Sequence, residues 1–219
     1  MDSHERIGFR EVSREGRGAG PSRSHAGVGM SRVIRTPSMR PIGPSEAEGL
    51  SAFAHPIWRE AFGPMLPGGI DEAERMFADW QSPDAIRRDI AGGFVYGYVV
   101  DGGALAGYYA YRAEGEGLRI SNCCLAPAYR GRGLCSFMLR EMLARGREAG
   151  CRRAHLHVNV RNAPAIRACE RNGFSVELHQ IVYRGEGFST NDYVMSREIR
   201  CSRRPCRRRS AGGGGTLST

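Results

Sequence analysis

A short apolar strand that runs directly into a glycine-containing turn and a helix, over residues 118–135, constrains the fold more than any other feature of the chain. The strand is predicted to end near Pro127, and the helix to cover 134–149. Between them lie the four residues that shape the turn: Arg130, Gly131, Arg132 and Gly133. The first N–H groups of a helix are unpaired and carry the positive end of its dipole, and glycine lets an anion approach the backbone closely. The segment therefore predicts a phosphate or pyrophosphate site, with an ordinary strand–turn–helix connection as the alternative.

Two common phosphate-binding motifs do not fit this segment. A P-loop requires Gly-Lys-Ser/Thr, and all 32 basic residues of this chain are arginine. A dinucleotide-binding loop requires a third glycine, where this chain has Ser136, and a carboxylate about 20 residues further on. The next predicted strand ends at Val160 and Arg161 without a carboxylate. Both motifs are therefore excluded.

A second motif follows in residues 154–174. Alternating hydrophobic residues predict an apolar strand over 154–160. Asn162 is then a typical N-cap, Pro164 lies in the first turn of a helix, and Gly173 follows the last residue of the helical pattern. The sequence thus predicts a short helix with both ends marked, placed after the anion-binding turn and its helix.

Together the two motifs resemble the acyl-CoA-binding core of the GNAT N-acetyltransferases. In that family Arg/Gln-x-x-Gly-x-Gly/Ala opens a helix, and Asn-x-x-Ala-Ile is followed by an aromatic position and Gly-Phe. The matching residues here are Arg130, Gly133, Asn162, Ala165, Ile166, Gly173 and Phe174. The resemblance extends from about Met39 to Ile199, so residues 39–200 are expected to form one N-acetyltransferase domain.

The pattern of strands and helices predicts an α/β fold with a mixed, mostly antiparallel sheet flanked by helices. This agrees with the single-domain acyl-CoA N-acyltransferase fold that the resemblance implies. Strands are expected at 39–42, 94–100, 104–112, 118–125, 154–160, 176–183 and 192–199, and helices at 45–62, 71–80, 83–91, 134–149 and 162–172. The residues Asp101-Gly102-Gly103 predict a tight hairpin between the second and third strands.

The basic charge of the chain lies outside the expected domain. Of the formal net charge of +9, residues 39–199 contribute none, while 1–38 and 200–219 contribute all of it. The Gly-, Ser- and Arg-rich segments 1–38 and 201–219 are expected to be disordered. No aromatic residues are interleaved with the arginines of the C-terminal tail, so no specific nucleic-acid partner is expected.

Targeting and cysteine patterns predict a cytoplasmic protein without a membrane partner. No apolar run is long enough for a signal peptide or a membrane span. The seven cysteines have no Cys-x-x-Cys spacing, which argues against a disulfide framework and a zinc site. His155 and His157 share a strand face, but no third ligand is identifiable, so no metal is expected. The sequence is compatible with either a monomer or a homodimer.

The resemblance implies acetyl-CoA as the co-substrate and a set of residues that bind it. Main-chain amides of the anion turn would hold the diphosphate: Arg130, Gly131, Arg132, Gly133, Leu134 and Cys135. The backbone of Cys123, Cys124 and Leu125 would pair with pantetheine like an extra strand, and one of these amides would polarise the thioester carbonyl. Asn162 would reach the pantetheine or the adenylate side.

The catalytic groups of the family pattern are replaced in this chain. Cys135 stands at the last glycine of the loop, and Cys169 stands at the aromatic position that usually carries a Tyr general acid. A thiol has a pKa of about 8.5 against about 10 for Tyr, but it is too short to reach the same point without a water. Ser121 replaces the Glu base of some members and could hold a water. Asp192 is the best candidate base, because 185–195 resembles the substrate-side closure of family members.

These observations predict an N-acetyltransferase that moves an acetyl group from acetyl-CoA to a primary amine by direct attack. A small polyamine-like or amino-acid-like amine is favoured as the acceptor, with protein N-termini as the runner-up. The missing Tyr and Glu leave open a non-catalytic acyl-CoA-binding module. A third alternative is a protein that associates with nucleic acids through its basic tails.

Overall fold

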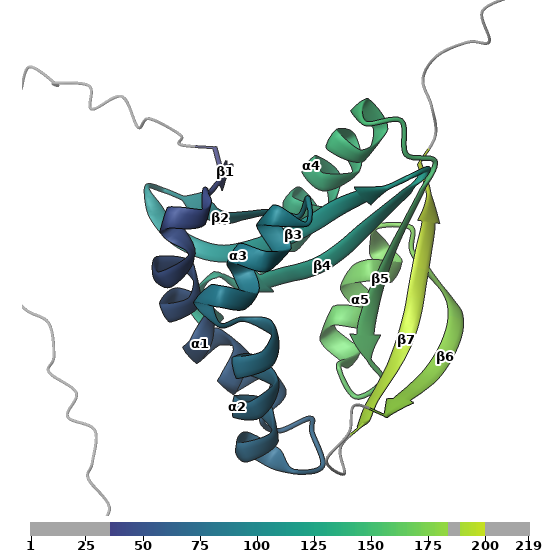
Figure 1. The fold of residues 1–219 in the computed structure, drawn as a ribbon. Helices are drawn as coiled ribbons and strands as arrows, with labels where there is room; N and C mark the ends of the chain where they lie inside the picture. Colours follow the sequence, from purple (N-terminus) through teal and green to yellow (C-terminus); the bar gives the residue numbers. More distant parts are fainter. Residues whose placement is uncertain (1–35, 184–188, 200–219) are drawn as a thin grey trace, which may run out of the picture. The chain divides into compact units, whose positions relative to one another are not determined.

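The computed structural model describes residues 36–183 and 189–199 (Figure 1). The predicted N-terminal extension lies outside the described residues except for its last three positions. The predicted tail at 201–219 lies wholly outside them. Within the described residues, no helix is both long enough and apolar enough to cross a membrane.

A seven-stranded sheet with the order β1-β2-β3-β4-β5-β7-β6 forms the centre of the fold. The strands are β1 Ser38–Pro41, β2 Val95–Asp101, β3 Ala104–Glu114, β4 Gly117–Leu125, β5 Arg153–Asn159, β6 Ser175–Tyr183 and β7 Ser189–Glu198. Within the described part of the chain, only the β4–β5 pair is parallel, and the other five neighbouring pairs are antiparallel. The expected mixed, mostly antiparallel sheet is therefore confirmed.

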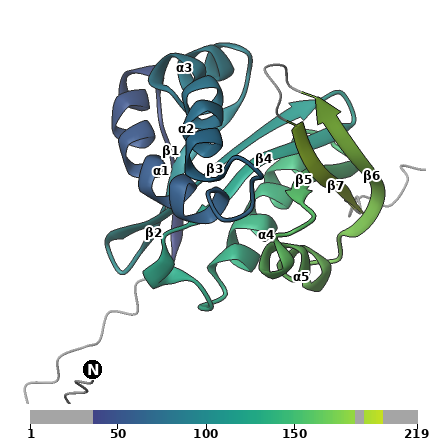
Figure 2. The same ribbon diagram turned by 90° about the horizontal axis from the view of Figure 1, so that it is seen from below.

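Five helices cover the two faces of this sheet (Figure 2). They are α1 Ala47–Phe62, α2 Gly69–Trp80, α3 Pro83–Ala91, α4 Leu134–Glu148 and α5 Ala163–Arg171. Tyr108 and Ala110 of β3 pack with α1–α3, whereas Tyr109 and Tyr111 pack with α4. This alternation follows from the two-residue period of a strand and gives the domain two cores, one on each face.

The parallel strands β4 and β5 separate after a short stretch of pairing. Pairing runs from Gly117 opposite Arg153 to Ile120 opposite Leu156, and beyond it the two strands diverge (Figure 1). The β3–β4 register shifts at the same point, because Ala110 pairs with Asn122 while Tyr111 pairs with Ile120. Ser121 is therefore the extra residue of a β-bulge, which bends β4 away from β5.

Several predicted boundaries differ from the observed ones. Strand β4 ends at Leu125, where the expected strand 118–125 also ends, because Pro127 opens a 3₁₀ turn over Pro127–Tyr129 and has no N–H to donate to a sheet. Strand β7 begins at Ser189, three residues earlier than predicted. The predicted cap of α5 is confirmed, since the Asn162 side chain accepts a hydrogen bond from the Ala165 N–H at 3.2 Å.

Candidate active site

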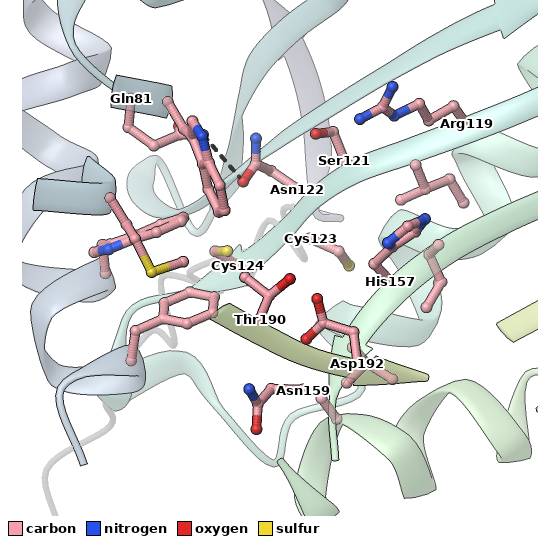
Figure 3. A pocket seen from close by; sticks show the side chains of 18 of the residues that line it. Gln81, Arg119, Ser121, Asn122, Cys123, Cys124, His157, Asn159, Thr190 and Asp192 are labelled. Atoms are coloured by element: carbon pink, nitrogen blue, oxygen red, sulfur yellow. Dashed lines mark hydrogen bonds between the residues drawn. The ribbon is translucent and has the colours of Figure 1, made fainter. Parts of the chain in front are cut away.

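A cavity of about 570 Å³ opens where β4 and β5 diverge (Figure 3). Helices α1–α3 supply one side of its lining, and β2, β3, β4, β5, α4, α5 and β7 contribute to the rest. Seven residues singled out in the sequence are brought together here: Ser121, Cys123, Cys124, Cys135, Asn162, Cys169 and Asp192. Leu125 and residues 130–134, all of them described, are not part of the lining, and they form the adjoining loop and helix start.

The cavity reaches both faces of the sheet. Cys123 packs against the core on the α4 face, whereas its neighbour Cys124 packs against the core on the α1–α3 face. Both residues line the cavity. Because successive side chains of a strand point to opposite faces, a space that both thiols line passes through the opening between the strands. Two molecules could therefore meet in it from opposite faces of the sheet.

The turn before α4 has the geometry that anion binding requires. Gly131 and Gly133 have φ angles of 74° and 81°, in the left-handed region that favours glycine, and an added Cβ at either position would meet open space. Gly133 is the N-cap of α4, and no described side chain caps that helix end. The first N–H groups of α4 therefore remain available to an anionic ligand.

The side chain of Arg130 is held by α1 instead of being free for a ligand. Its guanidinium forms two hydrogen bonds with the Glu60 carboxylate, Nη1 to Oε1 at 2.8 Å and Nη2 to Oε2 at 2.5 Å. Its Nε also donates to the Leu125 carbonyl at 3.1 Å. These contacts lower the pKa of Glu60. Arg130 thus fixes the end of β4 and the turn to α1, and its backbone N–H donates to the Pro127 carbonyl at 3.2 Å.

The edge of β4 that faces β5 is open along residues 121–125. On its other edge this segment continues to pair with β3, up to Leu125 opposite Gly107. Alternate backbone groups of a strand point to opposite edges, so those on the β5 side are available to an extended ligand. The sequence expectation that Cys123–Leu125 could pair with such a ligand is compatible with this geometry.

Three thiols gather at the α4 end of the cavity. The Sγ atoms of Cys123 and Cys135 are 3.8 Å apart, and Cys123 Sγ lies 3.9 Å from the Met138 sulfur. Cys169 is 7% exposed, and burial, followed by the nearby Cys135 and Glu170, raises its pKa to about 12. Cys169 is therefore a neutral thiol at physiological pH, which can donate a proton but is a poor nucleophile.

The candidate bases separate into two groups in the structure. Glu114, Glu116 and Glu177 form ion pairs with Arg112, Arg152 and Arg153 at 2.5, 3.1 and 2.9 Å. These carboxylates are half-buried or exposed surface partners of arginines. Asp192, by contrast, lies opposite Asn159 in the β5–β7 register and lines the cavity together with Ser121.

The sequence analysis expected no metal site, because His155 and His157 have no identifiable third ligand. Within residues 36–183 and 189–199 there is no group of three or more His, Cys, Asp and Glu side chains able to hold a metal ion. His157 lines the cavity, and its Nδ1 lies 3.0 Å from the Gln180 amide nitrogen. His155 is half-buried, and desolvation lowers its pKa.

The sequence analysis did not predict that α1–α3 form one wall of the cavity. The helices contribute the aromatic residues Trp58, Phe62 and Trp80 and the polar residues Asp79, Gln81 and Asp89, and the start of β2 adds Tyr96 and the preceding Phe94. The helical period of α1 and α2 indicates which residues are buried, but it does not distinguish a core contact from a cavity wall. The one sequence signal for this wall was Gln81, a polar residue at the end of α2.

Fold and site together define a protein of the acyl-CoA N-acyltransferase fold class. The chain belongs to the acetyltransferase (GNAT) family, whose family model matches residues 54–174. The expected family and fold are thereby confirmed.

Individual relatives match only part of this chain. An uncharacterised N-acetyltransferase of Mycobacterium bovis is 31% identical over 98 residues, which are 44% of this chain and 62% of that protein. Streptothricin acetyltransferase of Streptomyces lavendulae is 33% identical over 102 residues, 45% of this chain and 53% of that protein. The chain thus spans about half to three fifths of the length of these relatives.

A solved structure matches more of the chain at lower identity. The crystal structure of PaiA N-acetyltransferase from Thermoplasma acidophilum in complex with coenzyme A has a TM-score of 0.62 and 16% identity. The match covers 75% of this chain and 99% of that one. At this identity the likeness shows the fold.

Proposed function

We propose that this protein is an N-acetyltransferase that moves an acetyl group from acetyl-CoA to a primary amine of a small molecule. The observation that carries the proposal is the open N-terminus of α4 beside the open edge of β4, both at the cavity between β4 and β5. One ligand with a diphosphate at one end and an extended amide-containing chain at the other would satisfy both features. Coenzyme A is such a molecule.

Binding would divide between these two features. The amides of residues 131–135 would hold the diphosphate, and the backbone of Cys123–Leu125 would pair with pantetheine. Asn162, which lines the cavity, would contact the same chain while it caps α5. The Arg130–Glu60 pair would keep the turn in position. The thioester would then lie near Cys123, Cys135 and Cys169.

The reaction requires one bond to form and one to break. The amine nitrogen attacks the thioester carbon, the C–N bond forms, and the tetrahedral intermediate collapses with cleavage of the C–S bond. A β4 amide would donate to the carbonyl oxygen as negative charge develops on it. The amine must lose a proton, and the coenzyme A thiolate must be tolerated or protonated.

We assign the proton transfers to groups that line the cavity. Asp192, or a water held by Ser121, would accept the proton of the amine. Cys169 would supply a proton to the leaving thiolate only through a water, because its side chain is short. A thiolate leaves readily without an acid, so this donor contributes little to the rate.

The size of the cavity favours a small-molecule acceptor over a protein N-terminus. Its volume of about 570 Å³ lies within the range of about 300–1,000 Å³ typical of small-molecule sites. The relative from Streptomyces lavendulae is named for its action on streptothricin, a small molecule. Acceptors that are polyamine-like or amino-acid-like remain the first choice, with protein N-termini as the alternative.

Thiol release from acetyl-CoA with a panel of amines tests the proposal. The panel should contain diamines, amino-acid amides and a short peptide with a free N-terminus. Release that depends on one amine class and yields the N-acetylated product is expected. Tight acetyl-CoA binding without release from any amine would contradict catalysis.

That second outcome would support a non-catalytic acyl-CoA-binding module. A specific observation favours it: the position of the family's Tyr general acid holds Cys169, which is buried and has a raised pKa. A module of this kind would bind acetyl-CoA with or without an amine present, and amines would leave the affinity unchanged.

A further inference from the structure

Three buried polar side chains line the cavity with atoms that lack a partner. Gln81 is 4% exposed, Asn122 5% and Thr190 4%. Gln81 Oε1, Asn122 Nδ2 and Thr190 Oγ1 have no hydrogen-bond partner among the residues that the structure describes. The three come from the end of α2, from β4 and from β7, and Figure 3 shows them around one space. We call them the polar trio.

The orientation of the two amides is fixed by their neighbours. Gln81 Nε2 donates to Asn122 Oδ1 at 3.4 Å. The Tyr96 hydroxyl, which lines the same cavity, donates to Asp89 Oδ2 at 2.7 Å. Because the Gln81 amide nitrogen donates to Asn122, the Gln81 amide oxygen is the atom without a hydrogen-bond partner among the described residues. Asn122 accepts this hydrogen bond with its amide oxygen, so its N–H₂ group is without a partner among the described residues.

The polar trio therefore offers one acceptor, one donor and one hydroxyl that can do either. Leaving such groups buried and unpaired costs free energy, and apolar residues of the same shape would avoid that cost. Their position on a cavity, and not in the packed core, provides a reason for them: a bound molecule completes their hydrogen bonds.

We infer that the polar trio recognises an uncharged group of the acceptor amine that both donates and accepts hydrogen bonds, such as a hydroxyl or a carboxamide. This inference rests on the proposed function and specifies its substrate class. A carboxylate would meet the lone pairs of Gln81 Oε1, and an ammonium would meet the N–H₂ group of Asn122. A neutral donor–acceptor group satisfies both.

The acceptor would enter from the α1–α3 face. Cys124, two residues after Asn122 on β4, packs against the core on that face, and Gln81 follows α2 on the same side. The cysteines proposed to lie near the thioester belong to the opposite core. The polar trio would thus hold the far end of the acceptor while its amine points into the opening between β4 and β5.

A series of straight-chain primary amines of equal length, ending in a methyl, a hydroxyl, a carboxamide or a carboxylate, tests this inference. Turnover of each is measured with acetyl-CoA, and binding of each to the protein with coenzyme A is measured by calorimetry. We expect kcat/KM for the hydroxyl and carboxamide amines to exceed that of the methyl amine by about tenfold or more.

Thr190→Val and Thr190→Ser provide the matched variants. Thr190→Val removes the hydroxyl with little change in shape and should remove most of the preference, with the thermal midpoint unchanged or raised. Thr190→Ser keeps the hydroxyl and should keep the preference. An equal loss for all amines in Thr190→Val would identify a structural role and contradict the inference.

Measuring both binding and turnover of these amines distinguishes a failure of the inference about the polar trio from a failure of the proposed function. Turnover without a preference for the polar ends would overturn the inference and leave the proposed function standing. A binding preference without turnover of any amine would overturn the proposed function and support the polar trio. If no amine is turned over and no polar end is preferred in binding, both the inference and the proposed function are overturned. The case in which only water occupies the polar trio gives this result.

Discussion

The Arg130 guanidinium meets the Glu60 carboxylate through two hydrogen bonds, although the two residues are 70 positions apart in the chain. The pair joins α1 to the turn before α4, and a third hydrogen bond joins it to the end of β4. Three elements around the candidate site are thus connected through one side chain. We therefore expect Arg130 to position the turn and not to bind the anion directly.

Removing either partner of this pair should have the same effect. The two side chains are 42% and 49% exposed, so the pair contributes at most about 1 kcal/mol, equivalent to about a fivefold change in affinity. Glu60→Gln and Arg130→Ala should each weaken acetyl-CoA binding by about that much, and the double variant by no more. Calorimetric titration measures these affinities, with Arg152→Ala, which removes an exposed ion pair with Glu116, as a control. If Arg130→Ala weakens binding and Glu60→Gln does not, Arg130 contacts the ligand directly.

Replacing Gly133 tests the shape of the anion-binding turn. Gly133→Ala forces a Cβ into the left-handed region, at a cost of roughly 1–2 kcal/mol, and disturbs the first amides of α4. Acetyl-CoA binding should weaken on the order of tenfold, because those amides would no longer converge on one point.

Gly115 provides a matched control, because it has a φ of 58° and open space around it in the loop between β3 and β4. Gly115→Ala should lower the free energy of unfolding by a similar amount with no effect on acetyl-CoA affinity. Equal affinities for the two variants would show that the turn before α4 does not bind the cofactor.

Asn162 has a cap role and a proposed binding role that can be separated. Asn162→Ala removes the acceptor for the Ala165 N–H and should lower the free energy of unfolding by about 1 kcal/mol. Asn162→Ser keeps a capping oxygen and should restore the stability, but not the KM for acetyl-CoA. Recovery of both in Asn162→Ser would leave Asn162 as a cap alone.

Cys169 should contribute little to the rate of acetyl transfer. Its thiol is short and buried, so Cys169→Ala is expected to lower kcat by less than about tenfold, below the range of about 10²–10⁴ seen for a general acid. Steady-state kinetics at saturating acetyl-CoA measure this. A larger loss, with the KM for acetyl-CoA unchanged, would make Cys169 the proton donor.

The raised pKa of Cys169 also predicts a pH dependence of stability. Because its folded pKa is about 12 and its ordinary value is near 9, the unfolded chain loses this proton first as the pH rises. The free energy of unfolding should therefore fall between pH 9 and pH 12 and be unaffected below pH 9. Urea unfolding should show a smaller fall in Cys169→Ala than in the wild type. Equal falls would contradict the raised pKa.

Local chemistry explains what could be predicted from the sequence. The cap at Asn162 and the left-handed conformation of Gly133 involve only residues that are close together in the chain. The residue types at these positions therefore favour both features. The sheet strands follow from alternation to within one residue at each end, apart from the start of β7. These features were sufficient to predict the family and the fold.

Long-range pairs explain what could not be predicted. The Arg130–Glu60 contact and the Gln81–Asn122 contact join residues 70 and 41 positions apart. Neither periodicity nor spacing relates such residues, because their partnership depends on how α1 and α2 pack over β4. The acceptor side of the cavity is built from contacts of this kind, so the sequence alone did not indicate its polar trio.

A crystal structure of the protein with coenzyme A tests the central claim most directly. The account predicts the diphosphate within hydrogen-bond distance of the main-chain N–H groups of residues 131–135, with pantetheine running along Cys123–Leu125 between β4 and β5. Coenzyme A bound elsewhere on the molecule, with this opening empty, would contradict the account.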